Sequence, residues 1–199
     1  MPEISLTDLV DIVSRSGTPK ANKVAQVKAR PDYEPAFDFY KALRDRIVEV
    51  HKAGGQKSAL NAFMGSITDP KKQTNYPSAL NGYKKWWGQK QLSWFTPPRT
   101  GYTKHGVEVI INPELGLDVN GARYLVKMYF KNDPLSKLRI DVITRLMEGT
   151  LRGACQANEV MAVLDVRQAK LFSFQGNTGA SMAIIDAELA YVANLWPHV

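Results

Sequence analysis

Lysines alternate with large aromatic rings in one stretch near the middle of the chain, residues 83–95, which reads YKKWWGQKQLSWF. Ammonium groups neutralise phosphates and release their counterions, and flat rings accept unstacked bases, each stack contributing about 1–3 kcal/mol. These residue types at this spacing indicate a nucleic-acid-binding surface. On a helix, Tyr83, Trp87 and Trp94 lie near one face. The alternative is therefore that the rings pack into the core while the lysines stay solvated.

The charge of the chain is concentrated around this stretch. The net charge is +7, and residues 51–104 hold nine Lys and Arg against a single acid, Asp69, while the rest of the chain is nearly balanced. So local an excess favours a polyanionic partner more strongly than a high isoelectric point alone. We expect Tyr83 and Trp86 to stack on bases. The cations expected to contact phosphates are Lys71, Lys72, Lys84, Lys85, Lys90 and Arg99.

A second basic and aromatic surface is predicted on the long strand 122–131. Alternation sends one set of side chains to the core, namely Ala122, Tyr124, Val126, Met128 and Phe130. On the other face Arg123 falls opposite Asp118 across a two-residue turn, so we expect that pair to neutralise itself. The residues left to extend the binding surface are Lys127, Tyr129 and Lys131. Sheets that bind RNA use similar chemistry, and an ordinary solvated strand face is the alternative.

Carboxylates precede Lys127 on neighbouring predicted strands, and they raise the possibility of nuclease chemistry. The set consists of Glu108, Glu114, Asp118 and Lys127. It resembles the site of the PD-(D/E)xK nucleases over about 25 residues. That resemblance implies metal-dependent cleavage of phosphodiesters. The chain departs from the family at Leu125, where an acid should stand two residues before the lysine, so a second metal anchor is missing unless Asp165 replaces it.

Other arrangements that carry chemistry are not found in the sequence. The loop Gly176–Gly179 before a helix lacks the lysine of a P-loop and the spacing of a dinucleotide fingerprint, so we expect a turn capped by Ser181. The three histidines are far apart, and no Cys/His spacing suggests zinc. Cys155 is expected to be a small packed residue. We therefore expect no catalytic residue, metal or cofactor.

The elements that must position these residues are helical in the first half of the chain. Ser5 with Asp8 predicts a capping box on a helix over 4–15. Residues 16–32 read as a connector. A helix over about 35–53 begins at Pro35 and ends at Gly54-Gly55. Residues 56–95 then predict two or three short helices, with breaks at Gly65, Asp69-Pro70 and Pro77.

Beyond residue 105 the hydrophobic period becomes alternating, which is typical of strands. Asn120-Gly121 between two alternating runs predicts a tight hairpin, because both turn residues need positive φ. A helix opens at Asp133-Pro134. The predicted strands are 107–112, 115–119, 122–131, 160–166 and 170–174, and the last helix spans about 181–196. The order β-β-β-α-β-β-α predicts a mainly antiparallel sheet with helices packed on one face.

The chain is thus predicted to be α+β, with a mainly helical basic region over 1–104 and a sheet region over 105–199, or one continuous domain. Apolar runs are too short to span a membrane, and a single cysteine with no signal-like start suggests the cytoplasm. The predicted function is non-catalytic binding of nucleic acid, DNA or RNA. The alternatives are a phosphodiester-cleaving enzyme and an interaction subunit of a homo- or hetero-oligomer that uses the Trp-rich segment as its interface.

Overall fold

The structure is a computed structural model that describes residues 1–30, 38–176 and 179–199. Its main elements in chain order are β1 (Glu3–Ser5), α1 (Leu6–Val13), α2 (Gly17–Lys28), α3 (Lys41–Lys52), α4 (Pro70–Trp87), β2 (Leu92–Phe95), β3 (Thr100–Lys104), β4 (Val107–Ile111), β5 (Leu115–Val119), β6 (Ala122–Tyr129), α5 (Lys137–Leu151), β7 (Val160–Asp165), β8 (Lys170–Ser173) and α6 (Gly179–Leu195). Short 3-10 turns η2 (Lys57–Leu60) and η3 (Ala62–Ser66) link α3 to α4. The predicted helix start at Pro35, the loop residues Asn177 and Thr178, and the side chain of Ser181 lie outside the described part.

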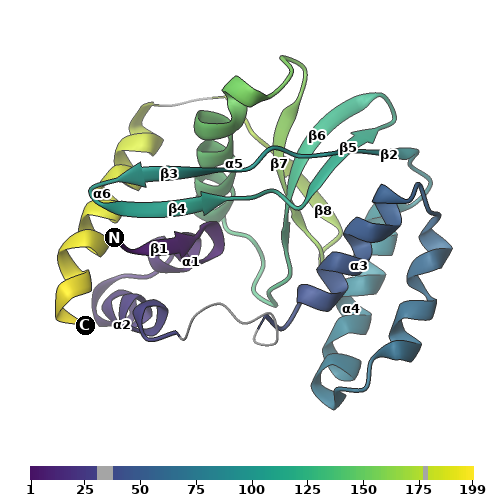
Figure 1. The fold of residues 1–199 in the computed structure, drawn as a ribbon, viewed down its shortest axis with the longest axis horizontal. Helices are drawn as coiled ribbons and strands as arrows, with labels where there is room; N and C mark the ends of the chain where they lie inside the picture. Colours follow the sequence, from purple (N-terminus) through teal and green to yellow (C-terminus); the bar gives the residue numbers. More distant parts are fainter. Residues whose placement is uncertain (31–37, 177–178) are drawn as a thin grey trace.

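The strands form two mixed sheets, so the α+β class is confirmed (Figure 1). The larger has the order β2-β5-β6-β7-β8, and the smaller has the order β1-β4-β3. Among the strands of the described residues, β1–β4 and β6–β7 are parallel pairs and the other pairs are antiparallel. Both sheets join strands from either side of residue 104.

The hairpin of β5 and β6 forms at Asn120-Gly121, whose φ angles are 53° and 90°. Asp118 and Arg123 are register partners, as expected. Their side chains nevertheless turn elsewhere, since Asp118 Oδ1 accepts from the Gly121 N–H at 2.6 Å and Arg123 donates to Glu159 Oε1 at 2.7 Å. The expected self-neutralising pair is therefore wrong.

Helices cover both faces of the five-stranded sheet, so the prediction of helices on one face is wrong. Leu125 and Tyr129 of β6 belong to a core shared with α1, α2, α5 and α6. Val126 and Met128, on the opposite face of the same strand, belong to a second core shared with α3 and α4. In Figure 1 the pair α3 and α4 lies at one end of the molecule and α6 at the other. A strand buried on both faces leaves no solvated side for ligand binding.

The first helix follows its sequence signals, and the second does not. Ser5 Oγ accepts from the Asp8 N–H at 3.0 Å and donates to the Asp8 carboxylate at 2.7 Å, which confirms the capping box. α2 stands where we expected a connector. Its Pro19 lies in the first turn, where the missing N–H breaks no helical bond, and buried Val24 and Val27 join the core.

Three further boundaries differ from the prediction. Pro77 does not break α4, which runs unbroken from Pro70 to Trp87, because tertiary packing of its aromatic face outweighs the lost hydrogen bond. Residues 92–95 form β2 rather than the end of a helix. α5 begins after Ser136, whose Oγ accepts from the Arg139 N–H at 3.3 Å, rather than at Asp133-Pro134.

α4 touches the β7–β8 turn backbone to backbone at Gly82. A Cβ atom at this position would lie 2.1 Å from the Val166 carbonyl oxygen and 2.9 Å from that of Arg167. Such a contact is far inside van der Waals distance, and its neighbours are main-chain atoms that cannot rotate away. Only glycine lets α4 lie this close to the sheet.

We predict that Gly82→Ala lowers the free energy of unfolding by about 1–3 kcal/mol through overpacking, although alanine is the better helix former by about 1 kcal/mol. Gly149→Ala is the matched control, because this helical glycine of α5 has only ordinary contacts with Met182. The control should be neutral or stabilising in urea unfolding. Equal stability of the two variants would show that α4 does not depend on the bare glycine.

Candidate nucleic-acid interface

The aromatic side chains of α4 all face inward. Asp69 caps the helix by accepting from the Lys71 N–H at 2.8 Å. Tyr76, Tyr83, Trp86 and Trp87 are then buried in the core that α4 shares with α3 and the sheet. Tyr83 is 0% exposed and Trp86 only 4%. The stacking expected of Tyr83 and Trp86 is therefore wrong, because the face that docks α4 on the sheet is the face that carries the rings.

A buried histidine joins α3 to this aromatic face. His51 Nε2 lies 2.7 Å from the Tyr83 hydroxyl, and its ring stacks on Trp87 at 4.5 Å between centroids. Burial lowers the pKa of His51 from 6.5 to about 4. The imidazole is therefore neutral at physiological pH and acts as part of the core.

Four lysines gather at the last turn of α4, where Gly88 ends the helix with a φ of 54°. Lys57 Nζ donates to the Gly88 carbonyl at 2.8 Å, and Lys90 Nζ donates to the Trp86 carbonyl. Lys84 Nζ donates to Asn61 Oδ1 at 2.6 Å, and Lys85 is exposed on the same turn. We call Lys57, Lys84, Lys85 and Lys90 the C-terminal lysine cluster.

The charge of this cluster is not balanced by acids. A helix C-terminus carries the equivalent of about half a negative charge, which four ammonium groups exceed several-fold. Within the described ranges, none of the four lysines takes part in an ion pair. Capping of the helix explains part of the arrangement, and most of the positive charge remains.

The exposed face of α4 is a polar stripe that begins and ends with lysine. Its residues, spaced three and four apart, are Lys71, Thr74, Ser78, Asn81 and Lys85. Lys72 is half-buried beside the first of them. Arg167, from the β7–β8 turn, donates to Ser78 Oγ, to the Tyr40 hydroxyl at 2.6 Å and to the Phe130 carbonyl at 2.8 Å. The guanidinium therefore adds a positive charge beside the middle of the stripe.

Two members of this surface were missed by sequence reasoning. Lys57 belongs to the positively charged segment 51–104, but the residues around it in the sequence do not predict that its side chain reaches the end of α4. Arg167 is remote in sequence and follows a buried strand, so only the docking of α4 on the β7–β8 turn brings it here. Arg99, by contrast, is exposed beyond the far end of β2 and is not brought to the cluster.

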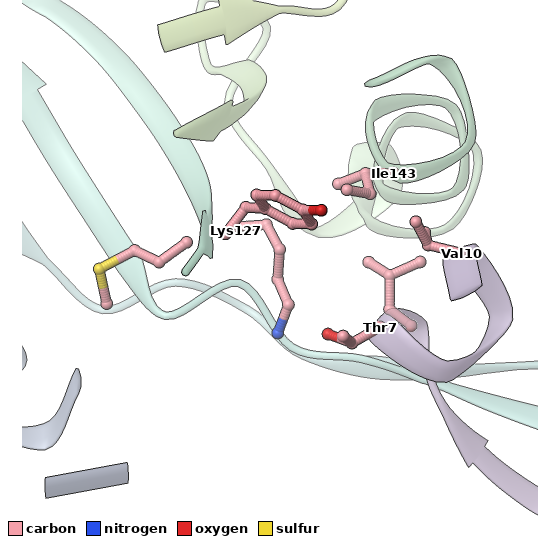
Figure 2. A pocket seen from close by; sticks show the side chains of 7 residues that line it. Thr7, Val10, Lys127 and Ile143 are labelled. Carbon is pink, nitrogen blue, oxygen red and sulfur yellow. The ribbon is translucent and has the colours of Figure 1, made fainter. Parts of the chain in front are cut away.

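Lys127 is buried, so the structure corrects its expected role on a binding surface. The residue is 7% exposed, and its ammonium donates to Glu114 Oε1 at 2.5 Å and to the Asn112 carbonyl and Oδ1, both at 3.2 Å. Figure 2 shows this side chain reaching from β6 towards Thr7, beside Val10 and Ile143. The cavity between them has a volume of about 10 Å³, which is close to the minimum for one water molecule. All three donors of the lysine are used.

The other residues of the same strand face are also unsuited to bind phosphate. Tyr129 is buried and accepts a hydrogen bond from Arg139 at 2.6 Å. Burial, with nearby charges, raises the pKa of Tyr129 to about 12. Lys131 forms an ion pair with the buried carboxylate of Asp11. The second expected surface therefore does not form, because α1 and α5 cover this side of β6.

The carboxylates of the nuclease-like set do not converge. Glu114 contacts Lys127, but Asp118 lies four residues further along the chain, in β5, and Glu108 belongs to the smaller sheet. Asp165 pairs in register with Tyr129 and accepts from the Gln168 N–H at 3.0 Å. Among the described residues, no three His, Cys, Asp or Glu side chains gather as a metal site. The geometry gives no support to the cleavage reaction that the resemblance implied.

An open cleft of about 490 Å³ lies near the end of β2. The Arg123 guanidinium stands 3.8 Å from the centroid of the Phe95 ring and is paired with buried Glu159. Cys155 also lines the cleft, and burial raises the pKa of its thiol to about 11. The thiol is thus protonated at neutral pH and a poor nucleophile. The charges of the cleft are neutralised within the protein.

Comparisons with protein-family models, with curated protein sequences and with solved structures give no match for this chain. Within the described ranges, no helix has the length and apolar character to cross a membrane.

The lowered pKa of His51 makes stability depend on pH. Between pH 6.5 and 4 the unfolded chain binds a proton that the folded protein excludes, so the free energy of unfolding falls as the pH drops. The loss is about 1.4 kcal/mol per pH unit, or about 3 kcal/mol over the window. Urea unfolding of wild type and His51→Gln at several pH values isolates this contribution. A His51 imidazole that titrates above pH 6 in folded protein by NMR would contradict it.

The buried pair of Glu114 and Lys127 generates a second stability prediction. Glu114→Gln leaves a buried ammonium without its counter-charge, which should lower the free energy of unfolding by about 3–5 kcal/mol. Glu148→Gln is the matched control, because its partner Arg152 is more exposed and the pair is a surface i, i+4 contact. The control should lose less than about 1 kcal/mol. If Glu114→Gln and Glu148→Gln lowered the free energy of unfolding by similar amounts in thermal or urea unfolding, the Glu114–Lys127 pair would contribute no more to stability than a surface pair does.

Proposed function

We propose that this protein binds nucleic acid without catalysis, through exposed and half-buried lysines and one half-buried arginine around α4. We call this set the α4 cationic surface, and it comprises the C-terminal lysine cluster, Lys71 and Arg167. The observation that carries the proposal is the cluster itself, in which four lysines lie around one helix end and form no ion pair with any residue that the structure describes. The expected contacts are with phosphates.

The cluster is unfavourable for the protein on its own. Like charges at one surface repel each other, by an amount that grows as they approach and as they are desolvated. Several lysines elsewhere in the chain do stand beside acids, as Lys131 stands beside Asp11 and Lys104 beside Asp186. A phosphate backbone would relieve the repulsion at α4 and release its own counterions. This balance favours a polyanionic ligand over a purely solvated surface.

The side chains between the lysines favour nucleic acid over an anionic membrane or a protein partner. A helix that lies on a membrane inserts an apolar face, whereas Thr74, Ser78 and Asn81 of the exposed stripe are all polar. The Trp86 and Trp87 indoles that could anchor a protein interface are buried. The single free thiol of Cys155 fits a reducing compartment, so we place this binding activity in the cytoplasm.

We predict that Lys84→Gln with Lys85→Gln weakens nucleic-acid binding about tenfold at low salt. Each lost phosphate contact should also reduce the steepness of log K against log salt by about 0.7–0.9, so the double variant should lose about 1–2 in slope. Fluorescence anisotropy over a salt series measures both effects.

The control is Lys104→Gln with Lys137→Gln, which removes the same charge from residues outside the α4 cationic surface. This variant should bind within about twofold of wild type. Equal weakening in both variants would show that binding depends on the net charge of the protein and not on the α4 cationic surface. Binding that is absent at low salt, or independent of salt, would overturn the proposal. Tighter binding to anionic vesicles than to nucleic acid would also overturn it and would indicate a membrane ligand.

A further inference from the structure

We infer that the ligand of the α4 cationic surface is a double-stranded nucleic acid, held by its phosphate backbone along the length of α4. This inference rests on the proposed function and goes further, because it names the class of nucleic acid. Two features of the same helix lead to it. One is where its rings lie, and the other is how its exposed charges are spaced.

Single-stranded nucleic acid is usually held by rings on which its bases stack. α4 contributes four aromatic residues to the molecule and buries all of them. Trp94 of the adjoining β2 is only partly buried, but the Lys52 ammonium lies 5.5 Å from the centroid of its ring. A strand laid across this surface would therefore gain phosphate contacts and little stacking.

The exposed stripe of α4 is long, polar and charged at intervals. Lys71 and Lys85 are separated by fourteen residues of one continuous helix, which is about 21 Å. Ser78, where Arg167 joins the stripe, lies about 10 Å from each end. With one charge per 3.4 Å of axis on each strand, this length corresponds to about six base pairs.

A duplex fits this pattern better than a flexible strand does. Its phosphates are fixed in space and have twice the charge density along the axis of a single strand. The helix offers small polar side chains, Thr74 and Asn81, between its cations, and these can approach phosphates or sugars closely. Nothing on the stripe provides the flat platform on which a splayed base would rest.

The test compares a short duplex of mixed sequence with each of its separated strands, by anisotropy at matched salt, for DNA and for RNA. We expect at least one duplex type to bind about tenfold more tightly than its strands. Lys71→Gln, at an exposed and unpacked position, should reduce the slope against log salt by about 0.9. Arg167→Gln is assayed in parallel, with circular dichroism to verify its fold.

A charge inserted into the stripe supplies a matched pair of variants. Asn81→Glu places a carboxylate between the cations and should weaken duplex binding about tenfold, through repulsion of phosphates. Asn194→Glu makes the same change at an exposed helical position of α6, at the other end of the molecule, and should leave binding unchanged.

The outcomes separate this inference from the proposed function. Single strands that bind as tightly as both the DNA and the RNA duplex would overturn the duplex assignment while the proposed function stands. Duplex preference that is insensitive to both Lys71→Gln and Asn81→Glu would overturn the placement along α4. Failure of every nucleic acid to bind at low salt would remove the proposed function and the inference with it.

Discussion

The close approach of α4 to the β7–β8 turn is the constraint on which the rest of the structure depends. Gly82 allows the helix backbone to lie directly against the carbonyl groups of Val166 and Arg167. This contact fixes the rotation of α4 about its axis. Tyr76, Tyr83 and Trp87 then point into the core, and the lysines have only the outer side available.

The same contact decides which interactions the outer face can make. The rings of α4 stabilise the helix against α3, where His51 bonds Tyr83 and stacks on Trp87. Since these rings are buried in that core, the exposed face of α4 carries only charged and hydrogen-bonding side chains. The contact also determines the position of Arg167, because the turn that lies against Gly82 brings this guanidinium to Ser78. Ligand recognition through this surface is thus electrostatic.

Much of the fold follows from local signals in the sequence, namely the Ser5 capping box, the Asn120-Gly121 hairpin and the alternation of the strands. The burial of β6 on both faces does not follow from local signals. The alternating cations Arg123, Lys127 and Lys131 are typical of a solvent-exposed strand face. Arg123 and Lys131 pair with the buried carboxylates of Glu159 and Asp11 from distant segments, and Lys127 pairs with the half-buried Glu114 next to β5. Alternation reports which side chains share a face and says nothing about what covers it.

The candidate site could be predicted only in part for a similar reason. The charge excess of residues 51–104 led to Lys84, Lys85 and Lys90, which the fold brings together at one helix end. The sequence allowed the rings of the same stretch either to stack on bases or to pack into the core. The close contact of α4 with the β7–β8 turn at Gly82 places them in the core. Periodicity could not place Lys57 or Arg167, because their positions depend on contacts between elements far apart in the chain.

The most direct test of the central claim is an NMR titration of the isotope-labelled protein with a short duplex at low salt. We expect amide shifts to change for residues of α4, for Lys57 to Asn61 and for the turn at Arg167, and to revert as salt is added. Changes confined to α6 or to the cleft beside Phe95, or no changes at all, would contradict the claim that the lysines around α4 form the binding surface.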